Sequence, residues 1–166
     1  MRYQGMMKAS LADGIGWRTV LFLSGCEHHC PGCHNPQTWD RDSGEFFGPG
    51  ALRVLLKALS RPEIDGLTIS GGDPLMPYNR EGVEALMAII KQVYPDKTIW
   101  VYTGYDWEQV RDLPLMQYVD VLVDGKFVLC DRDTTIAFRG SPNQRIIDVQ
   151  KSLAMPIGPP VELHYD

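Results

Sequence analysis

The chain has 166 residues, which is enough for one domain and too few for two of full size. Hydrophobic residues make up 44% and charged residues 22% of the chain, as in an ordinary globular protein. The formal net charge of -5 argues against a large nucleic-acid-binding surface, and no apolar run is long enough to span a bilayer. Residues 1–10 lack the apolar core of a signal peptide, so we expect a cytoplasmic protein with neither nucleic-acid nor membrane partners.

Short apolar strands alternate with helical patterns along the first half of the chain. The first predicted strand, residues 20–23, is apolar throughout, as buried parallel strands are. The loop that follows, residues 26–50, is rich in Gly, Pro, Asn and His, and connectors of this length are usually functional. Leucines at helical spacing predict a helix over residues 49–60. A second strand at 67–70 then precedes a helix whose apolar stripe spans 83–93.

The second half of the chain continues this alternation and then loses it. We predict a third strand at residues 97–102, a short helix opened by a capping box at 106–109, and a fourth strand at 119–123. Two further predicted strands, at 135–139 and 145–149, have no helical pattern between them. Strand, loop and helix in repetition predict a parallel α/β sheet.

Polar and glycine-rich residues follow the ends of the predicted strands. In parallel α/β folds the functional site lies at the carboxyl ends of the strands. We therefore expect the loop after the first strand, residues 71–73, residues 103–104 and Asp124 to face one another.

Cys26, Cys30 and Cys33 lie within a stretch of eight residues, whereas Cys130 is distant and is interpreted as a packed residue. Without a secretion signal, such a cluster indicates a metal or redox site. Two interpretations remain open on spacing alone. A cubane iron–sulfur cluster on three cysteines keeps one iron accessible to a substrate, whereas a structural zinc site is closed by four ligands. The histidines that could complete a zinc site are His28, His29 and His34.

Three other loops carry groups that suit a charged or polar ligand, although each is also an ordinary turn sequence. Gly71-Gly72 permits close approach of the backbone, and a carbonyl together with the Asp73 carboxylate would accept hydrogen bonds from an ammonium group. Asp124 and Lys126 present opposite charges that can position a zwitterion or a carboxylate. Thr103, after the third strand, can approach a ribose.

The spacing Cys-x3-Cys-x2-Cys after a first strand, with a Gly-Gly-acid loop after a second, resembles the radical S-adenosylmethionine superfamily. The resemblance implies that Cys26, Cys30 and Cys33 bind one [4Fe-4S] cluster, whose fourth iron S-adenosylmethionine would chelate through its amino and carboxylate groups. One electron from the cluster would then cleave the sulfonium and give a 5′-deoxyadenosyl radical. Because the cofactors carry this chemistry, no side chain is expected to act as a catalytic base.

The resemblance narrows to the glycyl-radical-enzyme activases, and among these to the branch that serves anaerobic ribonucleoside-triphosphate reductase. Gly32, directly before the third cysteine of the loop, and several longer blocks carry this resemblance, which covers nearly the whole chain. The blocks are residues 13–18, 22–26, 30–39, 70–75, 102–105, 121–127 and 139–144.

Membership of this branch implies a reaction and a set of contacts. The radical would abstract a hydrogen atom from a glycine of the partner reductase, and the electron would come from a flavodoxin-type donor. The superfamily usually has glutamate where this chain has Asp73, and the shorter side chain favours contact through the backbone. The residues that would contact S-adenosylmethionine are Gly32 and His34 at the adenine, Gly71, Gly72 and Asp73 at the methionine moiety, and Asp124.

We expect a single domain over residues 1–166, with a core at about 13–149 and a proline-rich tail at 150–166. The chain has about four strand–helix units, half the number in a complete barrel. The expected fold is therefore an incomplete, open parallel β/α barrel of the radical S-adenosylmethionine type, accessible to a macromolecular substrate. Two alternative functions remain. One is a radical enzyme with another glycyl-radical partner or a small-molecule substrate, and the other is a zinc-binding module without enzymatic activity.

Overall fold

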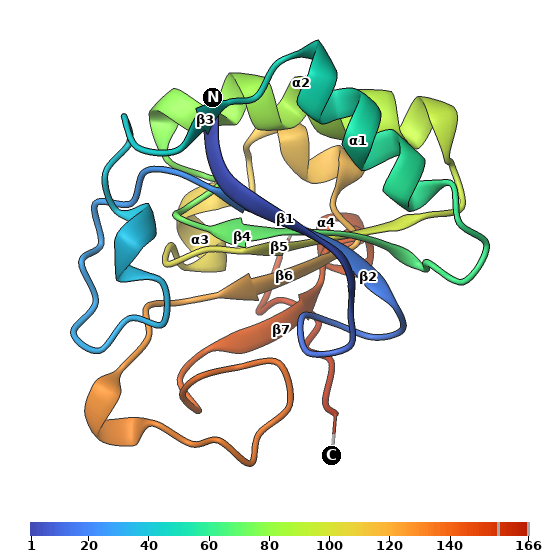
Figure 1. Ribbon diagram of the computed structural model, residues 1–166. Helices are drawn as coiled ribbons and strands as arrows, with labels where there is room; N and C mark the ends of the chain where they lie inside the picture. Colours follow the sequence, from blue (N-terminus) through green and yellow to red (C-terminus); the bar gives the residue numbers. More distant parts are fainter. Residues whose placement is uncertain (156, 166) are drawn as a thin grey trace.

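A seven-stranded mixed sheet forms the centre of the molecule in the computed structural model, which describes residues 1–155 and 157–165 (Figure 1). The strands are β1 (Arg2–Ser10), β2 (Arg18–Leu23), β3 (Glu45–Phe46), β4 (Gly66–Gly71), β5 (Thr98–Tyr102), β6 (Val121–Asp124) and β7 (Arg145–Asp148). Their order across the sheet is β3-β1-β2-β4-β5-β6-β7. The middle strands β2, β4, β5 and β6 are parallel, whereas β1, β3 and β7 pair antiparallel at the two sides.

The four parallel strands are the buried middle of the sheet. Leu21 and Leu23 in β2 and Leu67 and Ile69 in β4 are fully shielded from solvent. Such continuous burial is what a parallel strand with both faces covered requires. Pairing places Leu21 opposite Ile69 and Leu23 opposite Gly71. The loops that follow β2 and β4 therefore leave the sheet at the same edge.

Two long helices cover one face of the sheet (Figure 1). Both begin with proline in the first turn, where a backbone N–H has no partner within the helix. Their buried residues, such as Leu55 and Leu59 in the first helix and Leu86 and Ile90 in the second, lie four apart and pack on the strands as the main core. The helices are α1 (Pro49–Leu59), α2 (Pro77–Val93), α3 (Trp107–Val110) and α4 (Val149–Ala154), with the 3-10 helices η1 (Pro36–Thr38), η2 (Pro114–Tyr118) and η3 (Leu129–Asp131).

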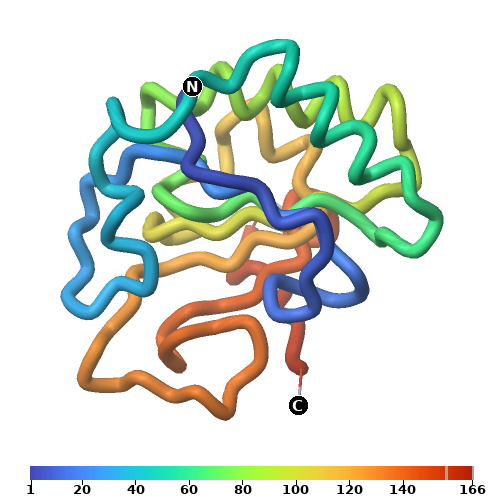
Figure 2. The backbone as a smooth tube through the Cα atoms, viewed as in Figure 1, coloured from blue at the N-terminus to red at the C-terminus, as the bar shows by residue number. Residues whose placement is uncertain are grey.

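The opposite face of the sheet carries a smaller apolar cluster around Trp100. The rings of Phe138 and Tyr165 pack against Trp100, with centroids 5.5 Å and 6.2 Å from it. Phe138 belongs to the loop of residues 125–144, which lies on the side of the sheet away from α1 and α2 (Figure 2). This face is therefore covered by a loop and by the last part of the chain, and not by a layer of helices.

The predicted central strands and both long helices are confirmed. The predicted capping box is also present, because the Asp106 side chain accepts from the third residue of α3 and the Asp106 N–H donates to the Gln109 side chain (2.9 Å). The expected parallel α/β sheet is found in the middle of a sheet that is mixed overall. Residues of the expected tail form α4 and pair Glu162 with Ile147, while residues 156 and 166 lie outside the described residues.

One strand predicted from the sequence is absent, and one observed strand was not predicted. The predicted strand at 135–139 is wrong, because Phe138 has φ 58, a left-handed conformation that no strand accommodates. β1 was not predicted, since its side chains are mostly polar or only partly buried and give no apolar run. The strand predicted at 145–149 exists as β7, but it pairs antiparallel with β6. The irregular segment before β7 replaces the helix that a parallel crossover would need.

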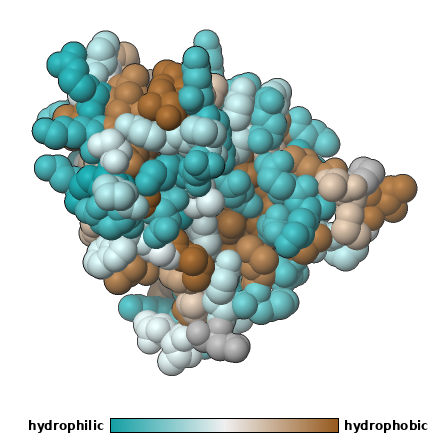
Figure 3. All heavy atoms as spheres, turned by 90° about the vertical axis from the view of Figure 1, so that its right-hand side faces the viewer, coloured by the Kyte–Doolittle hydropathy of each residue, from teal (hydrophilic) through white to brown (hydrophobic). Residues whose placement is uncertain are grey.

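The amino ends of the parallel strands lie on the side of the molecule that Figure 3 shows. Hydrophilic residues predominate on this side, with apolar residues interspersed among them. Within the described ranges, no helix combines the length and the apolar character needed to cross a bilayer.

A pair of neighbouring substitutions in α1 tests the position of the core. Leu55→Ala removes a side chain with 0% exposure and should lower the free energy of unfolding by about 2–5 kcal/mol, because it leaves a cavity against the sheet. Val54→Ala, at a position that is 49% exposed, should change it by no more than about 0.5 kcal/mol. Urea denaturation followed by circular dichroism measures both. Equal losses would contradict this packing of α1.

Candidate functional site

The cysteine loop, residues 24–35, begins at the carboxyl end of β2. Two backbone hydrogen bonds close its base, from the Gly25 N–H to the Thr38 carbonyl (2.7 Å) and from the Cys26 N–H to the Trp39 carbonyl (3.0 Å). Thr38 is the last residue of η1, so this short helix returns the chain to the sheet. The loop is therefore anchored at both of its ends.

The three cysteines of the loop border one small cavity of about 130 Å³. All three are half-buried thiols that form no disulfide. The Cys33 N–H donates to the Cys30 carbonyl (3.0 Å), which closes a tight turn in which Gly32 takes a left-handed φ of 71. The Asn35 N–H donates to the Cys33 sulfur (3.4 Å). Among the described residues, no three His, Cys, Asp or Glu side chains gather around a single-ion position.

The chemistry of these donors fits a thiolate-ligated centre. Burial raises the pKa of the Cys26 thiol to about 11, so this thiol keeps its proton at neutral pH until a metal replaces it. Thiolates are the ligands of iron–sulfur clusters. Three of them from one loop, with strand-end backbone along the rest of the cavity, suit a [4Fe-4S] cluster that keeps one iron accessible.

β4 ends at Gly71, and Gly72 follows directly; these two glycines allow the closest backbone contact of the site. Gly71 has φ 96, and a Cβ on it would lie 2.6 Å from the backbone nitrogen of Leu23. A Cβ on Gly72 would lie 2.5 Å from the carbonyl oxygen of Gly25. Because backbone atoms cannot move aside as a flexible side chain does, only glycine fits. The end of β4 thus packs directly on the start of the cysteine loop, and both glycines line the small cavity.

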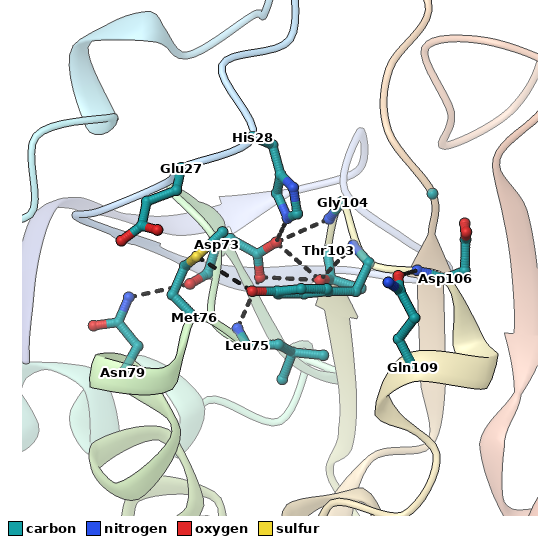
Figure 4. A network of polar contacts seen from close by, with 12 residues as sticks. Glu27, His28, Asp73, Leu75, Met76, Asn79, Thr103, Gly104, Asp106 and Gln109 are labelled. Atoms are coloured by element: carbon teal, nitrogen blue, oxygen red, sulfur yellow. Dashed lines mark hydrogen bonds and ion pairs between the residues drawn. The ribbon is translucent and has the colours of Figure 1, made fainter.

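Asp73 is buried, and its carboxylate accepts hydrogen bonds from all three loops around the site (Figure 4). The donors are the Leu75 N–H (2.8 Å), the Thr103 hydroxyl (2.9 Å), the Gly104 N–H (2.9 Å) and the Nε2 atom of His28 (2.8 Å). Both carboxylate oxygens therefore have partners within the protein. Asp73 and Thr103 both line the small cavity.

A larger cavity of about 790 Å³ adjoins the small one and shares Cys30, Cys33 and Phe127 with it. Gly32 and His34 line this larger cavity from the cysteine loop. Its volume lies in the range of about 300–1,000 Å³ that is typical of sites for small molecules and cofactors. The two cavities together provide room for a nucleoside-sized ligand directly beside the thiols.

The wall opposite the cysteine loop was not predicted from the sequence. It is the loop of residues 125–144, which contributes Phe138 and Arg139 to the larger cavity. Gln144 stabilises the return of this loop, because its side-chain oxygen accepts from the Gly140 N–H (2.9 Å). The sequence block at residues 139–144 was the available signal for this wall. Its polar residues did not indicate that it lines a cavity.

Asp124 and Lys126 line neither cavity. Asp124 is buried, accepts from the Trp107 N–H (2.7 Å) and pairs with Arg145 at 2.5 Å. Arg145 also pairs with Glu108 at 2.9 Å, and its hydrogen bond lowers the pKa of that carboxyl. This network ties β6 to β7 and α3. The structure thus brings Asp124 to Arg145 and not to the thiols, and Lys126 is exposed.

Comparison with known proteins places this site in a family. A family model described as "4Fe-4S single cluster domain" matches residues 12–147, which include the whole cysteine loop. The chain is 41% identical over 146 residues to the anaerobic ribonucleoside-triphosphate reductase-activating protein of Enterobacteria phage T4. This alignment covers 88% of this chain and 93% of the relative. The proteins of that name from Haemophilus influenzae and Escherichia coli K12 are each 38% identical, over 88% and 87% of this chain and 97% and 96% of the relatives.

The matched domain defines the class of the protein as a 4Fe-4S protein. Within that class, the chain belongs to the family of anaerobic ribonucleoside-triphosphate reductase-activating proteins. The prediction of an iron–sulfur domain is confirmed, and the match favours it over the zinc-binding alternative. The contacts assigned to individual residues stay predictions.

Substitution of a single glycine tests the contact between β4 and the cysteine loop. Gly72→Ala places a methyl group 2.5 Å from the Gly25 carbonyl oxygen and should lower the free energy of unfolding by about 1–3 kcal/mol. Gly50→Ala is the control, because a Cβ there meets open space in the first turn of α1 and should leave stability unchanged or slightly higher. Denaturant unfolding of the metal-free protein measures both. A neutral Gly72→Ala would contradict the close contact.

Alkylation of the metal-free protein tests the raised pKa of Cys26. The exposed Cys130 should react with iodoacetamide first, because Cys26 holds almost no thiolate at neutral pH. Between pH of about 7.5 and 9.5, the alkylation rate of Cys26 should rise about 100-fold without a plateau, since its pKa of about 11 lies above this range. Peptide mapping by mass spectrometry follows each site. A plateau for Cys26 below pH of about 9 would contradict the assignment.

Proposed function

We propose that this protein is a radical S-adenosylmethionine activase that generates a glycyl radical on anaerobic ribonucleoside-triphosphate reductase. The observation that carries the proposal is the position of three thiols around one cavity, beside strand-end glycines and next to a second cavity of about 790 Å³. The domain match supports the [4Fe-4S] cluster, and the names of the relatives support the reductase as the partner.

The residues of the small cavity have two tasks in this proposal. Cys26, Cys30 and Cys33 hold the cluster as thiolates, so that one iron is left for the amino and carboxylate groups of S-adenosylmethionine. Gly71 and Gly72 bring backbone to the cavity edge, where carbonyl oxygens can accept hydrogen bonds from the amino group. The cluster and S-adenosylmethionine supply, when bound, the one-electron cleavage of the sulfonium.

The remaining contacts follow from the lining of the two cavities. Gly32 and His34 line the larger cavity and are the proposed neighbours of the adenine. Thr103 lies at the small cavity, on the proposed ribose side, with its hydroxyl held by Asp73. Because Asp124 is paired with Arg145, we assign it to holding the end of β6 and not to ligand contact.

Access for a macromolecular substrate follows from the uneven covering of the sheet. A loop, and not a helix layer, lies over the face that carries Trp100, which supports an incomplete, open barrel of the radical S-adenosylmethionine type. An extended glycine-bearing segment of the reductase would enter beside this loop. We further propose a flavodoxin-type electron donor and a reaction in the cytoplasm.

Radical formation on the reductase is the direct test. Anaerobically reconstituted protein, incubated with reductant, S-adenosylmethionine and the reductase, should give a glycyl radical signal in electron paramagnetic resonance. Replacing Cys26, Cys30 or Cys33 by Ala should abolish both the signal and the cleavage of S-adenosylmethionine, because each loss removes one cluster ligand. Cys130→Ala is the matched control and should retain both, since Cys130 lines neither cavity.

Three results would contradict the proposal. Near-normal cleavage in Cys33→Ala would show that the ligands are wrongly assigned. A colourless protein with one tightly bound zinc and no cleavage would favour the zinc-binding module. Cleavage of S-adenosylmethionine with a radical on a different glycyl-radical enzyme, and none on this reductase, would keep the chemistry and reject the partner.

A further inference from the structure

The geometry points to His28 as a positioning residue for the cluster ligands, through a buried pair with Asp73 that holds the stretch between Cys26 and Cys30 against the ends of β4 and β5. The inference rests on the proposed function and goes beyond it, because no role was assigned to this histidine except as a possible zinc ligand. His28 is called a positioning residue because it would act through the loop and not on the reacting atoms.

The His28 ring is held from three directions (Figure 4). Its Nε2 atom lies 2.8 Å from Asp73 Oδ2, and the two side chains are only 9% and 2% exposed. The ring also packs against the backbone of Gly104. A Cβ on Gly104 would lie 2.5 Å from the Cδ2 atom of His28. The Tyr105 ring meets it edge-on, with centroids 4.7 Å apart. Glycine at position 104 therefore makes room for this imidazole.

Asp73 is a fixed acceptor for this hydrogen bond. Three donors other than His28 bind its carboxylate, namely the Leu75 N–H, the Thr103 hydroxyl and the Gly104 N–H. They come from the residues that directly follow β4 and β5, two strands that pair in the middle of the sheet. Hydrogen bonds to a carboxylate are stronger than those between neutral groups. Asp73 is thus the fixed group, and its hydrogen bond to His28 holds the cysteine loop in place.

The other hydrogen bonds of the loop lie at its base or are local. At the base, the Asp73 N–H also donates to the Gly25 carbonyl (2.8 Å). The hydrogen bonds of Gly25 and Cys26 close its base, and that between Cys33 and Cys30 is local. His29, the neighbouring histidine, contacts the carbonyl of Glu27 within the loop and meets the Trp39 ring edge-on, with centroids 4.9 Å apart. In the part of the chain that the structure describes, His28 makes the side-chain hydrogen bond that joins residues 27–33 to another strand end.

This link matters for chemistry because His28 stands between two of the three thiols. If the segment shifts, Cys26 and Cys30 shift relative to the glycines of β4, and the open side of the cluster turns with them. Misplacement of reacting groups by about 1 Å can lower a rate by about 100-fold. His28 therefore sets the orientation of the three thiols relative to the strand ends. We expect the thiols to bind iron without this hydrogen bond.

Four variants separate this role from a general structural one. His28→Ala removes the contact, and His28→Gln can present an amide donor close to the position of Nε2. His28→Asn is equally polar but too short to reach Asp73. His29→Ala is the matched control, because this exposed histidine lies between the same two cysteines and does not contact Asp73.

The first measurement is amide hydrogen exchange of residues 27–33 in the metal-free protein. We expect exchange about tenfold faster or more in His28→Ala and His28→Asn, since a hydrogen bond to a charged group is lost. His28→Gln and His29→Ala should stay close to the wild type. Equal exchange in the Gln and Asn variants, or in His28→Ala and His29→Ala, would overturn the inference.

The second measurement uses the reconstituted protein. Iron content should remain near the wild-type value in all four variants, whereas kcat for cleavage of S-adenosylmethionine should fall about 10- to 100-fold in His28→Ala and His28→Asn, with a smaller change in KM. The change that S-adenosylmethionine causes in the electron paramagnetic resonance spectrum of the reduced cluster should be altered in these two variants and restored in His28→Gln. A normal spectrum and normal kcat in His28→Ala would reject the positioning role.

The two measurements also separate the inference from the proposed function. If the wild type fails to cleave S-adenosylmethionine, the proposed function fails, while hydrogen exchange still decides whether His28 holds the loop. If the wild type cleaves it and exchange does not differ between His28→Ala and His29→Ala, the positioning role fails alone.

Discussion

A carboxylate removed from water has to find its hydrogen-bond donors within the protein, because an unsolvated charge is costly. Asp73 finds them in the loops that follow β2, β4 and β5. One buried side chain therefore fixes three segments that are distant in sequence. The distances between the thiols, the glycines of β4 and the wall at Thr103 depend on this one set of hydrogen bonds. The carboxylate thus joins the three loops that surround the small cavity.

The sheet supports this arrangement because its two faces are covered differently. α1 and α2 bury the main core on one face, so the parallel strands end at fixed positions. On the other face a small aromatic cluster around Trp100 and the loop of residues 125–144 leave a cavity of about 790 Å³. The main core and the larger cavity therefore lie on opposite faces of the same strands.

Much of this organisation could be predicted from the sequence, because buried parallel strands and helices with leucine stripes have strong periodic patterns. The cysteine loop was predictable for a different reason, since three thiols at short spacing have few other uses. β1 and the segment around Phe138 could not be predicted, because a largely polar, partly buried strand and a left-handed loop residue carry no periodic signal. The pairing of Asp124 with Arg145 could not be predicted, because a sequence does not show which cation reaches a given carboxylate.

The contact between Gly72 and Gly25 has a consequence for how this family can vary. A side chain on Gly72 would collide with the backbone of Gly25, and no exchange of side chains elsewhere relieves a collision with backbone. Evolution can therefore replace this glycine only by rebuilding the path of the main chain. Glycine should therefore persist here in any descendant that keeps this backbone, whatever that descendant binds, because the packing of the main chain requires it.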